Sequence, residues 1–319
     1  MNTPLNQVGQ ASGQVMIIVN EHAGGGAMAD VFRRQEHALQ RALGEFDVAF
    51  TDGPGDATAL TREALTDGFT TIVSAGGDGT LNEVVNGFFG DDGALINPEA
   101  ALGLLNGGTG GDFRRTLRIG DTDHAIAVLS AGKTLRCDVG RITFADHQGE
   151  TRTRFFINIA SFGLSGAVVS KIPQFKQLGG SAAYMAATLS AMWSWRNPRV
   201  RLSVDDHFEA ELPITTVAVG NGRFFGGGMM ITPDATVISG ELDVTVLADV
   251  SRFDLLMLTK RIYDGTHIYT PKVISQRGKI VTAEAVGDTP ILIDLDGEGV
   301  GRLPARFEVV PNAINVLVP

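Results

Sequence analysis

The pattern of apolar and polar positions changes character part-way along the chain. Over the first 135 residues, short apolar runs alternate with longer segments in which apolar residues recur at helical spacing. Repeated strand–helix units of this length predict a parallel sheet with helices on both faces. The predicted strands are 15–19, 46–50, 71–75 and 101–105, and the predicted helices are 27–43, 56–66, 80–89 and 121–131.

Beyond about residue 135, strand-like runs follow one another across turns rich in Gly, Asp and Asn. This texture predicts an antiparallel β-sandwich with two helices, near 179–195 and 251–264. The predicted strands are 135–144, 151–160, 200–204, 214–219, 241–247, 279–285, 290–294 and 307–318.

The two textures predict a fold of the α/β plus β class with two domains. We expect an α/β domain over residues 14–135 and a β-sandwich domain over residues 136–306. Residues 307–319 form a C-terminal strand, and the sequence leaves open whether it returns to the first domain.

Composition narrows the classes of function. The 319-residue chain has a formal net charge of -10, which argues against a nucleic-acid binder because such proteins usually carry a basic face. The single cysteine, Cys137, cannot form an internal disulfide and is expected to be a small buried residue. The six histidines show no metal-ligand spacing. Residues 1–14 are polar and do not resemble a signal peptide, so we expect a cytoplasmic protein.

Glycines cluster where the predicted parallel strands end, and such sheets bind ligands at that edge. The clearest cluster, Gly76-Gly77-Asp78-Gly79, joins a buried strand directly to a helix. Glycine lets backbone N–H groups approach a ligand, and a helix N-terminus offers a phosphate free donors and partial positive charge. An acid beside this turn predicts a cation such as Mg²⁺ as well. A plain strand–turn–helix connection is the competing interpretation.

Two spacings in these loops predict how the following helices begin. Thr80 and Glu83 have the Thr-x-x-Glu spacing of a capping box, which would fix the start of the helix after the first loop. Thr109 and Asp112 repeat that spacing at the end of another glycine-rich loop. We therefore expect both loops to lead straight into capped helices.

Two further segments belong to the same edge of the sheet. A glycine-rich loop over residues 20–26 follows the first predicted strand, and Thr51 follows the second. Loops at the carboxyl ends of neighbouring parallel strands converge in space. This convergence favours phosphate binding more strongly than any single loop does.

The loop sequences resemble a known family. Residues 76–87, Gly-Gly-Asp-Gly-Thr-Leu-Asn-Glu-Val-Val-Asn-Gly, are similar to the nucleotide loop of the diacylglycerol kinase catalytic-domain family. That family includes bacterial soluble lipid kinases, sphingosine kinases and ceramide kinases. The other similar segments are residue 51 and residues 20–24, 55–57, 108–113, 137–140, 158–163, 233–235 and 296–298.

The resemblance implies an ATP-dependent lipid kinase that uses Mg²⁺. The first domain would bind ATP, the second would hold the lipid, and the active site would lie in the cleft between them. Asp296 would accept the proton of the lipid hydroxyl, and Asp78, Asp112 and Asp138 would form a water-linked acidic network around Mg²⁺. The implied nucleotide-binding residues are Asn20, Glu21, His22, Ala23, Gly24, Thr51, Gly76, Gly77, Asp78, Gly79, Thr80, Leu81, Asn82, Glu83, Gly108 and Thr109.

The sequence departs from the family pattern at several loop positions. Glu21 replaces a usual proline, Asn106-Gly107 replace a usual Pro-x pair, and Gly111 replaces a usual asparagine. These changes loosen the expected phosphate and adenine loops but leave the glycines in place.

A second departure concerns a structural magnesium site known from some bacterial members. Its spacing maps onto Thr236, Ser239 and Glu241, where the middle position usually carries an acid. With Ser239 there, the site is either absent or maintained by Glu241.

The residues around Asp296 support the implied role by themselves, though less strongly. Asp294, Asp296 and Glu298 alternate, so they could share one face at a strand end. A carboxylate there could take a proton during phosphoryl transfer, and nearby like charges would raise its pKa. A solvated acidic hairpin tip is the competing interpretation.

The chain carries one candidate membrane contact. The segment 192–201 combines two tryptophans with three arginines, and Lys171 and Lys176 lie a little earlier in the sequence. Aromatic residues prefer the headgroup layer and cations attract anionic lipid, so we expect transient peripheral contact with a membrane. Tryptophans in the core beside a solvated arginine edge are an equal alternative.

The sequence leaves two other functions open. NAD kinases also carry a Gly-Gly-Asp-Gly loop, although they lack the elements at 108–113 and 296–298. A catalytically weak lipid-binding regulator is favoured by Gly107, Gly111 and Ser239 and disfavoured by the intact Asp78 and Asp296. The sequence also leaves open a homodimer and the identity of the lipid.

Overall fold

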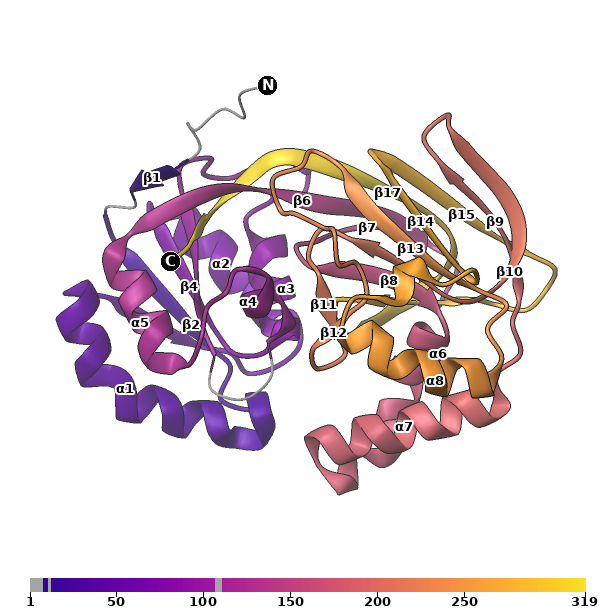
Figure 1. Ribbon diagram of the computed structural model, residues 1–319. Helices are drawn as coiled ribbons and strands as arrows, with labels where there is room; N and C mark the ends of the chain where they lie inside the picture. Colours follow the sequence, from indigo (N-terminus) through magenta and orange to yellow (C-terminus); the bar gives the residue numbers. More distant parts are fainter. Residues whose placement is uncertain (1–7, 11–12, 107–110) are drawn as a thin grey trace. The chain divides into compact units, whose positions relative to one another are not determined.

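The computed structural model describes residues 8–10, 13–106 and 111–319 (Figure 1). The chain divides into two compact units, Met1–Val139 with Pro311–Pro319, and Gly140–Val310. Two long strands, β6 (Lys133–Ala145) and β17 (Glu298–Leu317), each run through a boundary between the units. The sequence places these boundaries slightly earlier, at residues 135 and 306, because an uninterrupted strand offers no turn to mark them.

A parallel sheet forms the centre of the first unit. Among the described residues its strand order is β3-β2-β4-β5-β17. Every residue of β4 and β5 is buried, as expected for apolar runs covered on both faces. The strands are β2 (Val15–Val19), β3 (Asp47–Phe50), β4 (Thr71–Ala75) and β5 (Ala101–Leu105), and the short β1 (Val8–Gln10) pairs with β6.

Helices pack in pairs against this sheet. α1 packs against α5, and α2 packs against α3 (Figure 1). The helical segments are η1 (Ala23–Gly26), α1 (Ala27–Leu43), α2 (Asp56–Thr66), α3 (Asp78–Gly87), α4 (Asp112–Thr116) and α5 (Thr122–Ala131). Three of the four helices expected here agree closely with the structure, whereas α3 begins two residues earlier than predicted.

The strand order creates a switch point between β2 and β4. From β2 the chain moves outward to β3, whereas from β4 it moves the other way to β5. Connections that leave neighbouring strands in opposite directions open a crevice at their carboxyl ends, where open α/β sheets bind ligands. The loops after β2 and β4 both reach this point.

The antiparallel strands of the second unit pair in a closed circuit. β10 pairs with β9 along its first half and with β8 along its second half, while β17 pairs first with β16 and then with β15. Because β8 also pairs with β16 and β9 with β15, the ladder makes a closed circuit. The strands are β7 (Thr151–Phe156), β8 (Ile159–Gly163), β9 (Arg199–Val204), β10 (Phe208–Gly220), β11 (Phe224–Phe225), β12 (Met229–Met230), β13 (Leu242–Ala248), β14 (Val273–Gly278), β15 (Ile280–Val286) and β16 (Leu292–Leu295).

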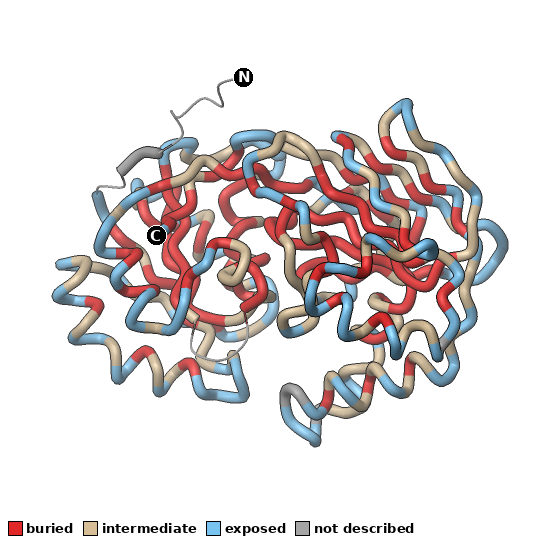
Figure 2. Tube along the Cα trace, in the orientation of Figure 1, coloured by how far each residue is buried: buried red, intermediate tan, exposed pale blue. Residues whose placement is uncertain are grey.

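The inner faces of this sandwich hold an apolar core. Val, Ile, Leu and Phe side chains from β6 to β10 and β13 to β17 are almost completely buried there. The rings of Phe162 and Phe307 stack with centroids 6.0 Å apart, which joins β8 to β17. Figure 2 shows the buried positions concentrated along the strands.

Helices of the second unit lie outside the strands. They are α6 (Leu164–Lys171), η2 (Ile172–Leu178), α7 (Gly180–Ser194), α8 (Arg252–Tyr263) and η3 (His267–Tyr269). α6 and β14 were not predicted, and the strand expected over 151–160 is broken at Ile157–Asn158. Within the described ranges, no helix combines the length and apolar character needed to cross a membrane.

Candidate active site

The loops after β2, β4 and β5 are joined by two side-chain amides. Asn20 Nδ2 donates to Thr80 Oγ1 at 2.9 Å, which links the first loop to the first turn of α3. Asn106 Nδ2 donates to the carbonyl of Gly76 at 3.3 Å, which links the third loop to the second. The loops therefore converge at the switch point, and Asn106, a departure from the family pattern, holds two of them together.

Gly76 and Gly77 serve this turn in different ways. A Cβ on Gly76 would lie 2.5 Å from Thr80 Oγ1, so no larger residue fits without moving α3. A Cβ on Gly77 would meet no atom of the described residues within 4 Å. Gly76 is thus required by packing inside the loop, whereas Gly77 leaves the space beside the turn empty.

The first turn of α3 presents backbone donors that bond no other described residue within the helix. Gly77 is the N-cap and receives no side-chain capping bond, and the first N–H bonded back to it is that of Leu81. Helix geometry therefore directs the N–H groups of Asp78, Gly79 and Thr80 out of the helix end. This arrangement suits an anion such as a phosphate.

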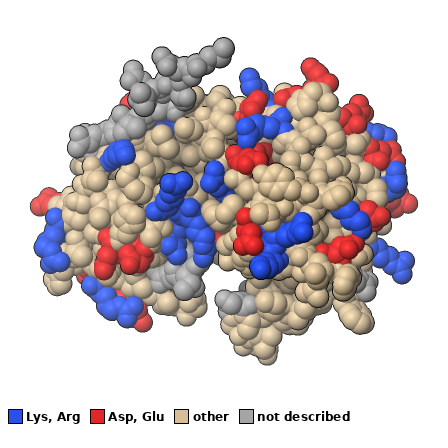
Figure 3. All heavy atoms as spheres, viewed as in Figure 1, with Lys and Arg blue, Asp and Glu red and all other residues tan. Residues whose placement is uncertain are grey.

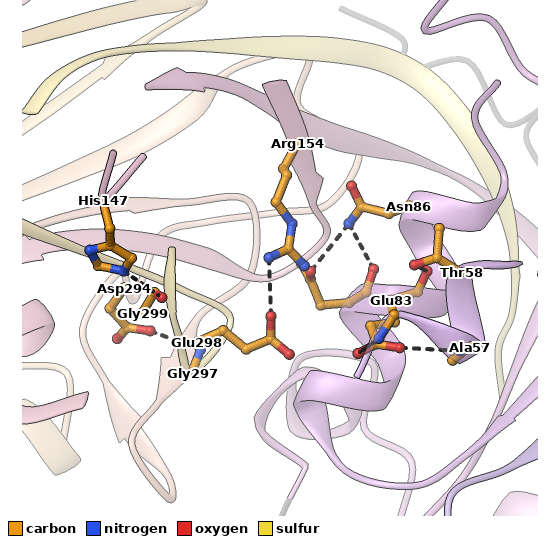
Figure 4. Close-up of polar contacts among 12 residues, drawn as sticks. Ala57, Thr58, Glu83, Asn86, His147, Arg154, Asp294, Gly297, Glu298 and Gly299 are labelled. Carbon is orange, nitrogen blue, oxygen red and sulfur yellow. Dashed lines mark hydrogen bonds and ion pairs between the residues drawn. The ribbon is translucent and has the colours of Figure 1, made fainter. Parts of the chain in front are cut away.

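The capping box predicted for Thr80 and Glu83 is wrong. Glu83 Oε1 accepts the N–H of Gly55 at 2.8 Å, and Oε2 accepts that of Ala57 at 3.2 Å (Figure 4). The carboxylate thus caps the neighbouring helix α2, while α3 begins at Asp78. The sequence spacing misled because Glu83 finds its partners in a segment 26 to 28 positions away.

The second predicted box also fails. α4 begins at Asp112 with Gly111 as its N-cap, so Asp112 is the first helical residue and not the third. Thr109, its expected partner, lies outside the described residues, as does Gly108. Their predicted contacts with nucleotide stay predictions.

The remaining residues of the first loop surround Asn20. Asn20 Oδ1 accepts the N–H of His22 at 3.1 Å, and its carbonyl accepts that of Ala23 at 3.1 Å. Gly24 follows with a positive φ of 64°. Glu21 is half-buried and pairs with Arg33 at 3.5 Å, so it points its charge along α1.

Three other residues that the family resemblance assigns to nucleotide binding are buried. Thr51 is 8% exposed, and its N–H donates to the carbonyl of Val19. Leu81 and Asn82 are also buried, in the first turns of α3. These residues support the loops through packing and main-chain bonds.

Two acidic residues meet at the start of α3 and α4. The N–H of Asp112 donates to both carboxylate oxygens of Asp78, at 3.0 and 3.1 Å. Burial, and then the neighbouring charge of Asp112, raise the pKa of Asp78 to about 6. Asp138 is buried elsewhere in the unit and accepts the N–H of Asn312 at 2.8 Å.

Asp78 and Asp112 fit a magnesium ion that is shared with a nucleotide. Mg²⁺ usually takes one or two carboxylates, substrate phosphates and water, and a cation would offset the burial and the neighbouring charge that raise the pKa of Asp78. No group of three or more Asp, Glu, His or Cys in the described part of the chain could hold a metal by itself. The water-linked network with Asp138 stays a prediction.

Cations beside this pair were missed from the sequence. Arg115 Nη1 binds Asp112 Oδ1 at 2.7 Å, and Arg114 donates to the carbonyl of Ile119. Arg118 is exposed just beyond α4. Figure 3 shows Lys and Arg side chains gathered over α4. The signal was present, since Arg-Arg directly follows the glycine-rich loop that ends at Asp112.

Asp296 lies in the second unit, in the turn between β16 and β17. Asp296 and Gly297 have φ of 48° and 94°, the left-handed pair of a two-residue hairpin that Asp-Gly favours. The side chain is only 7% exposed. Its Oδ1 accepts the N–H of Ile159 at 2.8 Å, and Oδ2 accepts that of Ile157 at 3.3 Å. The solvated hairpin tip is therefore the wrong interpretation.

Asp294 is buried beside Asp296. It accepts the N–H of Gly297 at 2.9 Å (Figure 4). It also accepts the hydroxyl of Ser161 at 3.2 Å. Burial, with the charges of Asp296 and Glu298, raises the pKa of Asp294 to about 7. A carboxyl that exchanges its proton near neutral pH thus adjoins the candidate base.

The third acid of this sequence motif is in a different environment. Glu298 is about one-third exposed and pairs with Arg154 at 3.1 Å (Figure 4). The predicted common face of the three acids is therefore only partly formed, because the left-handed turn redirects the chain after Leu295.

Asn158 occupies the break between β7 and β8 and was missed as an individual site residue. It is 4% exposed, and its Nδ2 donates to the carbonyl of Phe224 at 2.8 Å. Among the described residues its buried Oδ1 has no hydrogen-bond partner. It lies in sequence between the two residues whose N–H groups hold Asp296, so a buried acceptor is part of the segment that positions the candidate base.

The predicted structural magnesium ligands do not fit a metal. Ser239 Oγ is 2.8 Å from the carbonyl of Glu241 and 3.1 Å from that of Thr236. A hydroxyl that bonds these carbonyls occupies oxygens that a cation would need. Nearby, Arg277 Nη2 binds Asp243 at 3.0 Å and the carbonyl of Asp234 at 3.0 Å. Positive charge is thus already supplied by a guanidinium.

Comparisons with known proteins agree with this architecture. Residues 14–142 match the family model of the diacylglycerol kinase catalytic domain, and residues 158–318 match that of the YegS C-terminal NAD kinase beta sandwich-like domain. A Pseudomonas aeruginosa (strain UCBPP-PA14) protein named "Probable lipid kinase YegS-like" is 31% identical over 285 residues, 88% of each chain. A protein named diacylglycerol kinase from Mycobacterium tuberculosis (strain CDC 1551 / Oshkosh) is 30% identical and covers 83% of this chain and 82% of its own length.

Solved structures show the same fold. A diacylglycerol kinase from Bacillus anthracis str. Sterne aligns over 96% of this chain and 97% of its own, with a TM-score of 0.68 and 20% identity. Yeast NADH kinase is more distant, with a TM-score of 0.51 and 11% identity over 99% of this chain and 84% of its own. The resemblance seen in the sequence is confirmed, and the chain belongs to the diacylglycerol kinase catalytic-domain family.

Proposed function

We propose that this protein is an ATP- and Mg²⁺-dependent lipid kinase that transfers the γ-phosphate of ATP to a hydroxyl of a diacylglycerol-like membrane lipid. The observation that carries the proposal is the uncapped N-terminus of α3 at the switch point, with Asp78 beside it, in a member of this family. A helix end with free donors binds phosphate, and an adjacent carboxylate needs a cation.

The first unit supplies the nucleotide contacts. The N–H groups of Asp78 and Gly79 face the phosphates, and the Asn20–Thr80 bond holds the first loop against this helix end. Arg115, anchored on Asp112, adds positive charge near the phosphates. Mg²⁺, held at Asp78 and Asp112, would neutralise charge on the transferring phosphoryl group.

The second unit supplies the acceptor chemistry. The lipid hydroxyl oxygen forms a bond to the γ-phosphorus, the bond to the β,γ-bridging oxygen breaks, and ADP leaves with that electron pair. Asp296 receives the hydroxyl proton on a carboxylate that two backbone N–H groups hold in place. Asn158 Oδ1, which has no partner among the described residues, would accept from that hydroxyl, and Asp294 can hold a proton near neutral pH.

Transfer of labelled γ-phosphate from ATP tests the proposal. Diacylglycerol, phosphatidylglycerol, a sphingoid base and a polyprenol are presented in mixed micelles with Mg²⁺, and NAD is included as a soluble acceptor. Wild type is compared with Asp296→Asn and with Asp288→Asn, whose carboxylate is exposed in another turn. We expect label in one lipid, a loss of about 10²–10⁴-fold in kcat for Asp296→Asn, and little change for Asp288→Asn.

Other results would change the assignment. Label on NAD alone would favour a kinase of the NAD kinase type. ATP binding without label in any acceptor would favour a regulatory lipid-binding protein. Equal losses in both aspartate variants would remove Asp296 from its assigned role.

A further inference from the structure

α7 exposes its large apolar side chains to solvent and buries small ones. Ala183, Ala187 and Ala191 are buried and face the unit, at the four-residue spacing of one helix face. The side chains two positions further along point to the opposite face, because two residues advance a helix by about 200°. These outward residues are Met185, Leu189 and Trp193, which are 60%, 61% and 80% exposed.

α8 repeats the arrangement. Leu258 and Ile262 are buried, whereas its outward face carries Phe253, Leu256 and Met257, which are 71%, 66% and 64% exposed. Leu255 of α8 packs against the same cluster as Ala187 and Ala191, so α7 and α8 adjoin at that point. We call Met185, Leu189, Trp193, Phe253, Leu256 and Met257 the α7–α8 face.

The concentration of these residues is unusual. Most of the large apolar side chains that are exposed in the described part of the chain lie on these two helices or next to them. Single exposed apolar residues need no explanation, but several on adjoining helices mark a surface that binds something apolar. Figure 2 shows exposed and buried positions alternating along both helices.

Charge around the α7–α8 face identifies the partner. The chain has a net charge of -10, yet residues 164–196, which run through α6 and α7, contain no Asp or Glu and three Lys or Arg. Arg196 follows α7 and is exposed, and Lys260 and Arg261 are exposed in the last turn of α8. The single acid of α8, Asp254, is paired with Lys272 at 2.6 Å. An apolar face edged by cations complements anionic headgroups over an acyl layer.

We propose that the α7–α8 face docks onto the interfacial layer of a bilayer that contains anionic phospholipid. A second copy of the chain fits less well, because an isologous interface sets the same cations of both copies near one another. The sequence expectation of a membrane contact thus gains a specific surface. Of the two tryptophans, Trp193 belongs to it, whereas Trp195 is half-buried and donates to Asn197 Oδ1 at 3.0 Å.

The docking face connects directly to the acceptor site. α7 packs on α6, α6 packs on β16, and β16 leads into the turn that holds Asp296. Docking at α7–α8 therefore places the element next to the candidate base close to the lipid layer. The inference rests on the proposed lipid kinase activity for the identity of the substrate, but docking itself is measured without ATP.

Vesicle flotation tests the docking face. Wild type is mixed with vesicles of phosphatidylcholine alone, or of equal parts phosphatidylcholine and phosphatidylglycerol. We expect binding to the anionic vesicles, a loss of at least about tenfold in the partition coefficient for Leu189→Ser/Met257→Ser, and no loss for the control Ile238→Ala/Val286→Ala, which removes exposed apolar groups elsewhere. Lys260→Glu/Arg261→Glu should weaken binding to the anionic vesicles only.

Two further measurements distinguish membrane docking from self-association. Trp193 fluorescence should shift to the blue on anionic vesicles in a Trp195→Phe background, and sedimentation velocity reports self-association. Failure of wild type to bind either vesicle, or a wild-type dimer that Leu189→Ser/Met257→Ser converts to monomer, would overturn docking. Vesicle binding without lipid phosphorylation would support docking and contradict the proposed kinase activity. Lipid phosphorylation without vesicle binding would support the kinase activity and contradict docking.

Discussion

The two units build their candidate sites from different material. In the first, the ligand-facing groups are backbone N–H groups at the end of α3, set by the glycines at 76 and 77. In the second, they are the buried side chains of Asp294, Asp296 and Asn158. The first arrangement is encoded within a few consecutive residues, whereas Asp296 is held by Ile159, 137 positions earlier in the chain. Local sequence therefore reveals the first site much better than the second.

The largest expected effect tests the side-chain site through its pH dependence. The pKa of Asp294 is about 7 in the folded protein against a usual 3.8, so folding favours its protonated form. The stabilisation is fully present below pH 4 and is lost as the pH rises through 7. Between pH 5 and 8 we expect wild type to lose roughly 3 kcal/mol relative to Asp294→Asn, measured by urea unfolding.

The control for this titration is a carboxylate at the surface. Asp288→Asn changes an exposed residue of a neighbouring turn, so its stability difference from wild type should stay constant over the same pH range. A constant difference for Asp294→Asn as well would mean that Asp294 is ionised without penalty. In that case Asp294 could not hold a proton for Asp296 near neutral pH.

The second prediction tests the backbone site with a matched pair of glycines. Gly76→Ala places a methyl group 2.5–2.6 Å from Thr80 Oγ1 and Cβ, so the first turn of α3 must shift. We expect a loss of about 2 kcal/mol in unfolding free energy and at least about tenfold weaker ATP binding. Thermal unfolding and nucleotide titration measure the two effects separately.

Gly77→Ala should behave differently. An added Cβ would meet no atom of residues 8–10, 13–106 and 111–319 within 4 Å, so the fold should keep its stability to within about 0.5 kcal/mol. If phosphate approaches this turn, the same methyl group should still weaken ATP binding. Gly77→Ala that leaves both stability and ATP binding unchanged would argue that the ligand does not approach there.

The sequence predicted the first unit better than the second. The parallel strands, three of their four helices and the convergence of the loops could be predicted, because apolar runs and glycines are local signals. The role of Glu83 could not, because its partners Gly55 and Ala57 are brought close only by the packing of α2 on α3. A capping spacing in sequence does not say which helix the acid will cap.

The second unit was harder because its site depends on an interruption. The run Phe155-Phe156-Ile157-Asn158-Ile159 reads as one strand, yet the ladder breaks there so that two N–H groups turn to Asp296. Neither the break nor the burial of Asp296 has a local signal. The α7–α8 face could be predicted only in part. Its helices bury alanines and expose leucine and methionine, which reverses the usual preference.

The smallest expected effect concerns the loop at 236–241 in the second unit, where the Ser239 hydroxyl bonds two backbone carbonyls. Ser239→Asp would restore a carboxylate beside the carbonyls of Thr236 and Glu241. In nucleotide-free protein we expect Mg²⁺ at tenfold excess over its Kd to raise the stability of this variant by about 1.4 kcal/mol. Wild type should show no comparable gain, because Ser239 and Arg277 already satisfy the loop.

Ser239→Asn provides the neutral control, since it adds an amide oxygen but no charge. Thermal unfolding in EDTA and in MgCl₂ compares the three proteins. A gain for Ser239→Asp alone would show that the carboxylate was the missing ligand and that the loop geometry still accepts a cation. An equal gain in wild type would mean that Glu241 compensates after all, because the remaining oxygens would then bind Mg²⁺ in competition with the bond from Ser239 and the charge of Arg277.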